Sequence, residues 1–223
     1  MNTKPFFKKL ILCLFGGLVC GETFFHVGDK FLIALTVPAS LVVAVASLLI
    51  LASIIYAVVW HFKDKKTEDF HTSAIAFWIS AIQYGIAFNM ALFGFQRIFH
   101  MQPYAPLGML DEPFSSFSNQ WLTWGYFGRS YGFICVIGIL QIIGGFILIF
   151  NRTRLLGAIM ILPIMISIIL IDYFYDSYPS VLRHDVIIFL GVIYLLFTDI
   201  QRLVEFFFET TINRNIYSSQ CFY

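Results

Sequence analysis

The feature that most restricts this chain is a run of seventeen residues without a charge, residues 155–171. An α-helix rises about 1.5 Å per residue, so this run spans roughly 25 Å, close to the thickness of a bilayer's hydrocarbon core. Charges flank it, with Arg152 and Arg154 before the run and Asp172 after it. This layout predicts a membrane-spanning helix with one basic and one acidic end.

Composition indicates the same class of protein. Hydrophobic residues make up 59% of the chain and charged residues 12%, whereas soluble domains carry about 25% charge. The formal net charge is only +1, and the basic residues form short clusters rather than one patch, which excludes a nucleic-acid-binding surface. We therefore predict an all-α, multi-pass membrane protein whose surroundings are the lipid bilayer.

Further apolar runs extend the pattern to about six spans. Besides residues 155–171, the runs cover residues 10–21, 31–60, 72–96, 130–151 and 186–198. The second run is long enough to cross with a tilt or with a kink at Pro38. The last run is short, and it crosses if it extends outward through Val181 and inward past Asp199, with arginines snorkelling at its ends.

The first run has two further interpretations. Lysines precede residues 10–21 and Glu22 follows them, a pattern that also describes a signal peptide. The stretch before Glu22 lacks a convincing small-x-small cleavage site, which favours an uncleaved helix. A cleaved signal peptide and a hairpin that dips partway into the bilayer are the alternatives.

Charges alternate in sign from one loop to the next. The basic ends carry Lys4, Lys8 and Lys9, then Lys63, Lys65 and Lys66, then Arg152 and Arg154, and finally Arg202 and Arg214. The other ends carry Asp29, then Asp111 and Glu112, then Asp172, Asp176 and Asp185. Because lysine and arginine favour the cytoplasmic side, six spans place both termini in the cytoplasm.

On this topology, polar side chains gather where the spans reach the outer face. They are Gln96, Arg97, Gln102, Trp124, Arg129, Tyr131, Asp172, Tyr175, Asp176, Arg183, His184 and Asp185. Opposite charges at one depth predict ion pairs of Arg97 or Arg129 with an aspartate. The simpler interpretation leaves all these groups in the headgroup layer. The sharper one is a polar pocket between helix ends that binds a small molecule or a quinone headgroup.

The ligand-binding residues we predict are Arg97, Arg129, Gln141, Asp172, Tyr175 and Asp176. The two arginines would hold an anionic or carbonyl group, and the aspartates would fix the guanidiniums by paired hydrogen bonds. Gln141 lies deeper, and Gln83, Tyr84 or Asn89 could satisfy its amide. An interhelical hydrogen bond is favoured over substrate contact for this residue.

Catalytic and metal-binding signatures are not recognised in the sequence. It has no phosphate loop, no Rossmann glycine pattern and no nucleophile elbow. The spacing of the histidines does not support a metal site joining His100 and His184. Residues 203–223 alternate charged and apolar side chains, which predicts a helix along the cytoplasmic interface, with binding to a partner as the rival interpretation.

Several short motifs resemble one family. They are Phe93-Gly94-Phe95-Gln96-Arg97 with Gln102-Pro103, Trp124 with Gly128-Arg129-Ser130, residues 144–153 with Leu156-Gly157-Ala158, Tyr175-Asp176, and Asp199 with Arg202. On these motifs, residues 87–208 resemble the DoxX-like family of small bacterial integral membrane proteins. The resemblance implies a four-helix core in residues 71–202, preceded by an N-terminal helix pair and basic loop in residues 1–70 and followed by the tail. It also implies the bacterial cytoplasmic (inner) membrane.

The chain departs from the family pattern at an informative position. Gln141 stands where many members have glutamate, so proton chemistry performed by that acid in relatives is lacking here. Ser167 and Asp172 stand where close relatives often have asparagine, and Asn151 replaces an arginine.

Because some members resemble subunits of quinone-linked oxidoreductases, the resemblance implies a membrane subunit of a redox-linked complex. Its quinone-type or small-molecule pocket would lie near the outer face, and the chain would not be catalytic on its own. A protein subunit and a small hydrophobic ligand are the implied partners. Two alternatives stand beside this reading: a non-enzymatic bundle that binds or transports a lipid or hydrophobic solute, and a structural anchor for a larger membrane assembly.

Overall fold

The computed structural model describes residues 6–28, 36–63, 68–102 and 113–205. Within these ranges, six helices are long and apolar enough to cross a membrane, which confirms an all-α chain of multi-pass character. They are α1 (Phe6–Val27), α2 (Ala39–Lys63), α3 (Glu68–Ile98), α5 (Tyr131–Ile149), α6 (Arg154–Phe174) and α7 (Pro179–Thr198). Shorter elements are the 3-10 turn η3 (Phe114–Ser116) and the helices α4 (Asn119–Gly128) and α8 (Ile200–Val204).

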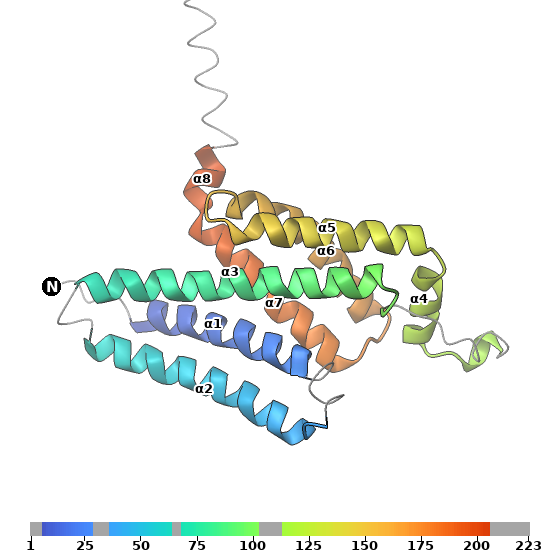
Figure 1. Ribbon diagram of the computed structural model, residues 1–223, viewed down its shortest axis with the longest axis horizontal. Coiled ribbons are helices and arrows are strands. Elements are labelled where there is room, and N and C mark those ends of the chain that lie inside the picture. The colour runs from blue at the N-terminus through green and yellow to red at the C-terminus, as the bar shows by residue number, and fades with distance from the viewer. Residues whose placement is uncertain (1–5, 29–35, 64–67, 103–112, 206–223) are drawn as a thin grey trace, which may run out of the picture.

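The long helix α3 occupies the middle of the bundle (Figure 1). It packs against α5 on one side and against α1 on the other, while α6 links α5 to α7. Helix α7 also contacts α1 and α3, and α2 packs chiefly on α1. The buried core is accordingly built around α3, from Trp78, Ile82, Ile86 and Met90 together with residues of α1, α5, α6 and α7.

Successive long helices run in opposite directions, so their ends gather at the two ends of the bundle (Figure 1). At one of them α1, α3 and α6 finish, while α2, α5 and α7 begin; we call it the α4 end, after the short helix that lies there. At the other, the α8 end, α5 and α7 finish and α6 begins. Polar residues on adjacent helix ends are thereby brought together.

Two prolines lie at or directly before the start of a helix. Helix α2 begins directly after Pro38, whose carbonyl oxygen accepts the first-turn hydrogen bond of the Leu41 amide at 2.9 Å. The expected kink at Pro38 is therefore wrong, because a proline that precedes the first turn disturbs no helical hydrogen bond. Helix α7 begins at Pro179, at the favoured first position, and includes the expected outward extension through Val181.

One helix, α4, was not expected from the sequence. The stretch from His100 to Trp121 reads as a loop, yet α4 begins at Asn119, with the Ser118 side chain accepting a hydrogen bond from the Trp121 amide at 3.4 Å. The Ser118 side chain stabilises the first turn of α4, so a helix begins here although the residues around its start are polar. Residues 103–112 lie outside the described residues, as does the predicted tail from residue 206 onward.

Glycines set the closest helix contacts. A Cβ on Gly17 would meet the Ser53 hydroxyl, and one on Gly21 would meet Ile50, as expected for close packing of α1 on α2. Gly132, in contrast, faces open space. Gly94 and Gly138 meet where α3 crosses α5, with a Cβ on Gly94 only 2.6 Å from the Gly138 carbonyl oxygen. This approach brings Arg97, one turn after Gly94, against α5.

Candidate ligand site at the α4 end

A cavity of about 400 Å³ lies between helices α3, α4, α5, α6 and α7. Most of its wall is apolar, with aromatic rings from three of these helices. The apolar lining includes Met90, Phe93, Trp124, Phe127, Phe133, Ile134, Met165 and Ile168. Helix α4 contributes Thr123, Trp124 and Phe127, so the helix that the sequence did not predict forms part of the wall.

Gln102, Thr123, Ser167 and Ser177 also line this mostly apolar cavity. Four further polar side chains reach it, one from each of four helices. They are Arg97 of α3, Gln141 of α5, Asp172 of α6 and Asp185 of α7. Gln141 is 1% exposed, Asp185 6% and Asp172 8%. Because a buried polar group costs free energy unless it is paired, the contacts among these four decide what the site can hold.

The guanidinium of Arg97 is the centre of the group. It donates a hydrogen bond through Nη1 to Oε1 of Gln141. It also interacts electrostatically with the carboxyl groups of Asp185 and Asp172, although among the described residues no direct ion pair within 4 Å joins it to either. One N–H of Arg97 is therefore used by Gln141, and the single positive charge of Arg97 only partly neutralises the two aspartates.

The two aspartates lie close to each other. Their carboxyl groups are within hydrogen-bonding reach, yet the buried Oδ2 of Asp172 receives no hydrogen bond from a described donor. Two carboxyl groups thus share the one guanidinium of Arg97, and Oδ2 of Asp172 is an acceptor that no described donor satisfies.

The structure brings together three of the six predicted ligand-binding residues, Arg97, Gln141 and Asp172. Arg129, Tyr175 and Asp176 are exposed and do not line the cavity. These three follow or end their helices, where side chains turn outward. A role for them in binding stays a prediction.

The expected ion pair of Arg129 with an aspartate is wrong for the part of the chain that the structure describes. Arg129 has no ion pair there, and Asp176 accepts a hydrogen bond from Nδ2 of Asn119 at 2.7 Å instead. Arg129 lies in the break between α4 and α5, whose geometry the sequence did not reveal.

Gln141 does form an interhelical hydrogen bond, but its partner is Arg97 rather than one of the three residues we expected. The amide of Gln83 donates instead to the carbonyl oxygens of Leu148 and Ile149, at 2.8 Å each. Asn89 donates to the hydroxyl of Thr23, and Tyr84 is exposed. The predicted partners therefore point away from the cavity.

A second polar cluster ties α1 to α7 beside the cavity. Nε of Arg183 lies 2.9 Å from Oε1 of the buried Glu22, and Nδ1 of His184 lies 3.7 Å from Oε2 of the same carboxylate. The ring of Phe93, which lines the cavity, packs 5.5 Å from the His184 ring, centroid to centroid. Sequence reasoning placed Glu22 only as the end of an apolar run, because the pairing depends on how α1 docks.

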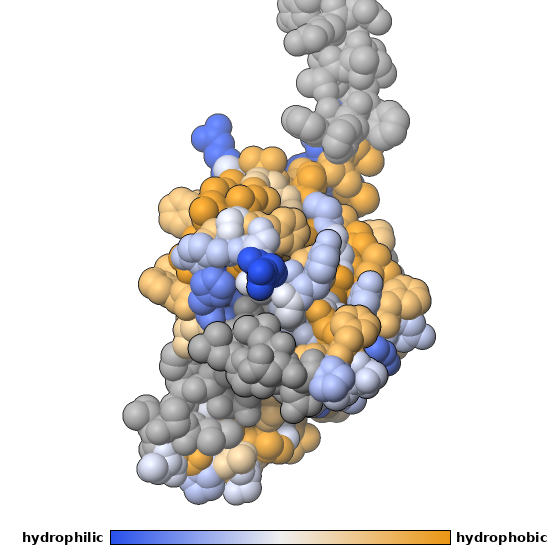
Figure 2. All heavy atoms as spheres, turned by 90° about the vertical axis from the view of Figure 1, so that its right-hand side faces the viewer, coloured by the Kyte–Doolittle hydropathy of each residue, from blue (hydrophilic) through white to orange (hydrophobic). Residues whose placement is uncertain are grey.

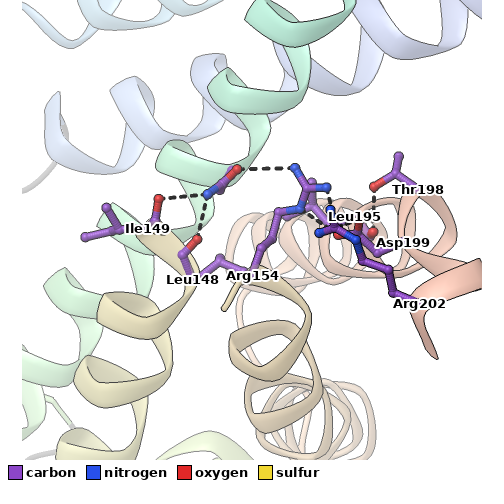
Figure 3. A network of polar contacts seen from close by, with 8 residues as sticks. Leu148, Ile149, Arg154, Leu195, Thr198, Asp199 and Arg202 are labelled. Atoms are coloured by element: carbon purple, nitrogen blue, oxygen red, sulfur yellow. Dashed lines mark hydrogen bonds and ion pairs between the residues drawn. The ribbon is translucent and has the colours of Figure 1, made fainter. Parts of the chain in front are cut away.

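A third cluster lies at the opposite, α8 end (Figure 3). Arg154, at the start of α6, binds Asp199, which follows α7, with Nη2 2.7 Å from Oδ2. Nη1 of Arg154 also lies 3.5 Å from Oε1 of Gln83, the residue whose amide holds the last carbonyls of α5. This cluster fastens α3, α5, α6 and α7 together.

Figure 2 looks onto the α4 end, where hydrophilic residues gather toward the middle of the face and hydrophobic residues form much of its rim. Among the described residues no group of three or more histidine, cysteine or acidic side chains is placed to hold a metal ion. The described side chains of the cavity offer hydrogen bonds and charge within mostly apolar walls.

Comparisons with known proteins add one distant relative. No family model matches the chain, and no solved structure matches it. The chain is similar to "Uncharacterized protein YwoB" of Bacillus subtilis (strain 168), with 29% identity over 93 residues. The match covers 41% of this chain and 58% of that protein, less than two thirds of its length. The DoxX-like resemblance stays a prediction beside this finding.

Proposed function

We propose that this multi-pass membrane protein binds a small amphipathic molecule, of the quinone headgroup type, in the cavity at its α4 end. The observation that carries the proposal is the meeting of Arg97 with the buried Gln141, Asp172 and Asp185, one residue from each of four helices, at a mostly apolar cavity of about 400 Å³. Ligand sites are typically of this size, with apolar walls and a few placed polar groups.

The aromatic and apolar walls of the cavity favour a ligand that has a ring and an apolar tail. Phe93, Trp124, Phe127 and Phe133 offer flat apolar surfaces for a ring. The guanidinium of Arg97 keeps donors beyond the one it directs to Gln141, and these could reach a ligand oxygen. A ligand headgroup would thus be oriented by its oxygen atoms and stabilised mainly by apolar contact.

The DoxX-like resemblance suggests the kind of complex in which this ligand site would work. It favours a membrane subunit of a redox-linked complex, in which a protein partner performs the electron transfer and this chain supplies the ligand site. The same resemblance favours the bacterial cytoplasmic membrane, and the charge pattern of the loops favours an orientation with the α8 end and both termini inside. The cavity would then open toward the outer face.

The test is direct binding by the full chain, purified in mild detergent from a bacterial host. Organic extraction and native mass spectrometry should find a co-purifying quinone, and a short-chain quinone added to stripped protein should quench tryptophan fluorescence saturably. Failure to retain or bind any quinone would overturn the proposal. Retention of a phospholipid in place of quinone would favour the alternative, a bundle that binds a lipid or hydrophobic solute.

A further inference from the structure

The cavity's polar groups are unbalanced in a way that restricts the ligand. Asp172 and Asp185 are both more than nine-tenths buried, and Oδ2 of Asp172 accepts no hydrogen bond from a described donor. The guanidinium of Arg97, which interacts electrostatically with both aspartates, already directs one N–H to Gln141. A buried acceptor without a donor is unfavourable, and more so when it is charged. A ligand that supplies the missing hydrogen would remove this cost.

Resting on the proposed function, we propose that the cavity selects the reduced, hydroquinone form of its ligand, whose phenolic hydroxyl donates a hydrogen bond to Asp172. A hydroquinone carries two O–H donors, whereas the oxidised quinone offers carbonyl oxygens alone. Carbonyl oxygens turned toward the aspartate pair would add acceptors beside one that no described donor satisfies. Arg97 can donate to the oxygen of either form.

Selective binding of one redox form changes the potential of the bound ligand. By linkage, a tenfold preference for the hydroquinone raises the midpoint potential of a two-electron couple by about 30 mV. The chain would then hold the reduced product more firmly than the oxidised substrate. No electron transfer by this chain is needed for that effect.

The experiment compares three probes under anaerobic conditions: a decyl hydroquinone, the corresponding quinone, and the hydroquinone dimethyl ether. The ether keeps the ring and tail but has no hydroxyl hydrogen. Titrating the detergent-purified full chain should give a hydroquinone Kd at least tenfold below those of the quinone and the ether. Equal affinities for the hydroquinone and the ether would overturn this inference and leave the proposed function intact. Binding of none of the three would overturn the proposed function itself.

A matched pair of variants assigns the preference to the aspartate. Asp172→Asn keeps the size of the side chain and introduces an N–H donor, so the preference for the hydroquinone should fall to less than threefold. Glu205→Gln makes the same change at an exposed site at the α8 end and should leave the preference unchanged. An undiminished preference in Asp172→Asn would contradict the assignment. If that variant does not elute as folded protein, Asp185→Asn provides the second test, and the probe series on the unaltered chain still decides the inference.

Discussion

Replacing Asp199 with alanine should destabilise the bundle by roughly 3–5 kcal/mol, the usual cost of removing one partner from a buried ion pair. The side chains of Arg154 and Asp199 are 13% and 8% exposed, and their closest charged atoms are 2.7 Å apart. Without Asp199 the Arg154 guanidinium remains buried, with only the 3.5 Å contact to Gln83. Because this cluster joins the ends of α5, α6 and α7 to Gln83 in the middle of α3 (Figure 3), its loss should loosen the whole α8 end.

The measurement is equilibrium unfolding of the detergent-solubilised protein with a denaturing detergent. Arg202→Ala is the matched control, because Arg202 is 63% exposed and lies 3.8 Å from Asp199; its loss should cost less than about 1 kcal/mol. The double variant Arg154→Met with Asp199→Leu should recover much of the loss, since it leaves no unpaired charge. An Asp199→Ala protein as stable as the unaltered chain would show that this cluster does not hold the bundle together.

Replacing Arg97 with methionine should weaken binding of the short-chain quinone and hydroquinone at least tenfold. The change removes the donor that faces the ligand oxygens and the cation that partly neutralises Asp172 and Asp185. Methionine keeps the apolar bulk of the side chain, so the cavity wall is largely preserved. Arg97→Lys should give an intermediate affinity, because a lysine keeps the charge without the planar fork of donors.

Saturable fluorescence quenching measures these affinities, with Arg152→Met as the control at the exposed α8 end. The control should bind as the unaltered protein does. Size-exclusion chromatography before each titration separates loss of the site from loss of the fold. Unchanged affinity in a folded Arg97→Met protein would remove the arginine from the site.

The sequence predicts the spans well because bilayer thickness imposes a simple rule on them. Long uncharged runs such as residues 155–171 need only be matched to helix length, and α6 covers that run with one residue added at its start and three at its end. Helix α4 was not predicted because that rule does not apply to it. Its ten residues are too few to span a bilayer, and its start depends on local capping by Ser118.

The sequence predicts residues of the site only where their position along a span is enough to place them near the cavity. Arg97 and Asp172 lie at one depth, and Gln141 was singled out as an amide in an apolar run. Asp185 was noted at that depth but not chosen, since the consecutive residues Arg183, His184 and Asp185 point in different directions around α7. Which of them faces the cavity depends on how α7 docks against α6 and α3, and the sequence pattern does not encode that rotation.

We expect all six long helices to cross the bilayer in alternating directions, so that the α4 end with its cavity lies outside. Topology reporters fused after residues 66, 110 and 153 test it most directly, using one reporter active only in the cytoplasm and another active only outside it. We expect the reporters after residues 66 and 153 to be active in the cytoplasm and the reporter after residue 110 to be active outside. A cytoplasmic signal at residue 110, or an external one at residue 66 or 153, would contradict it.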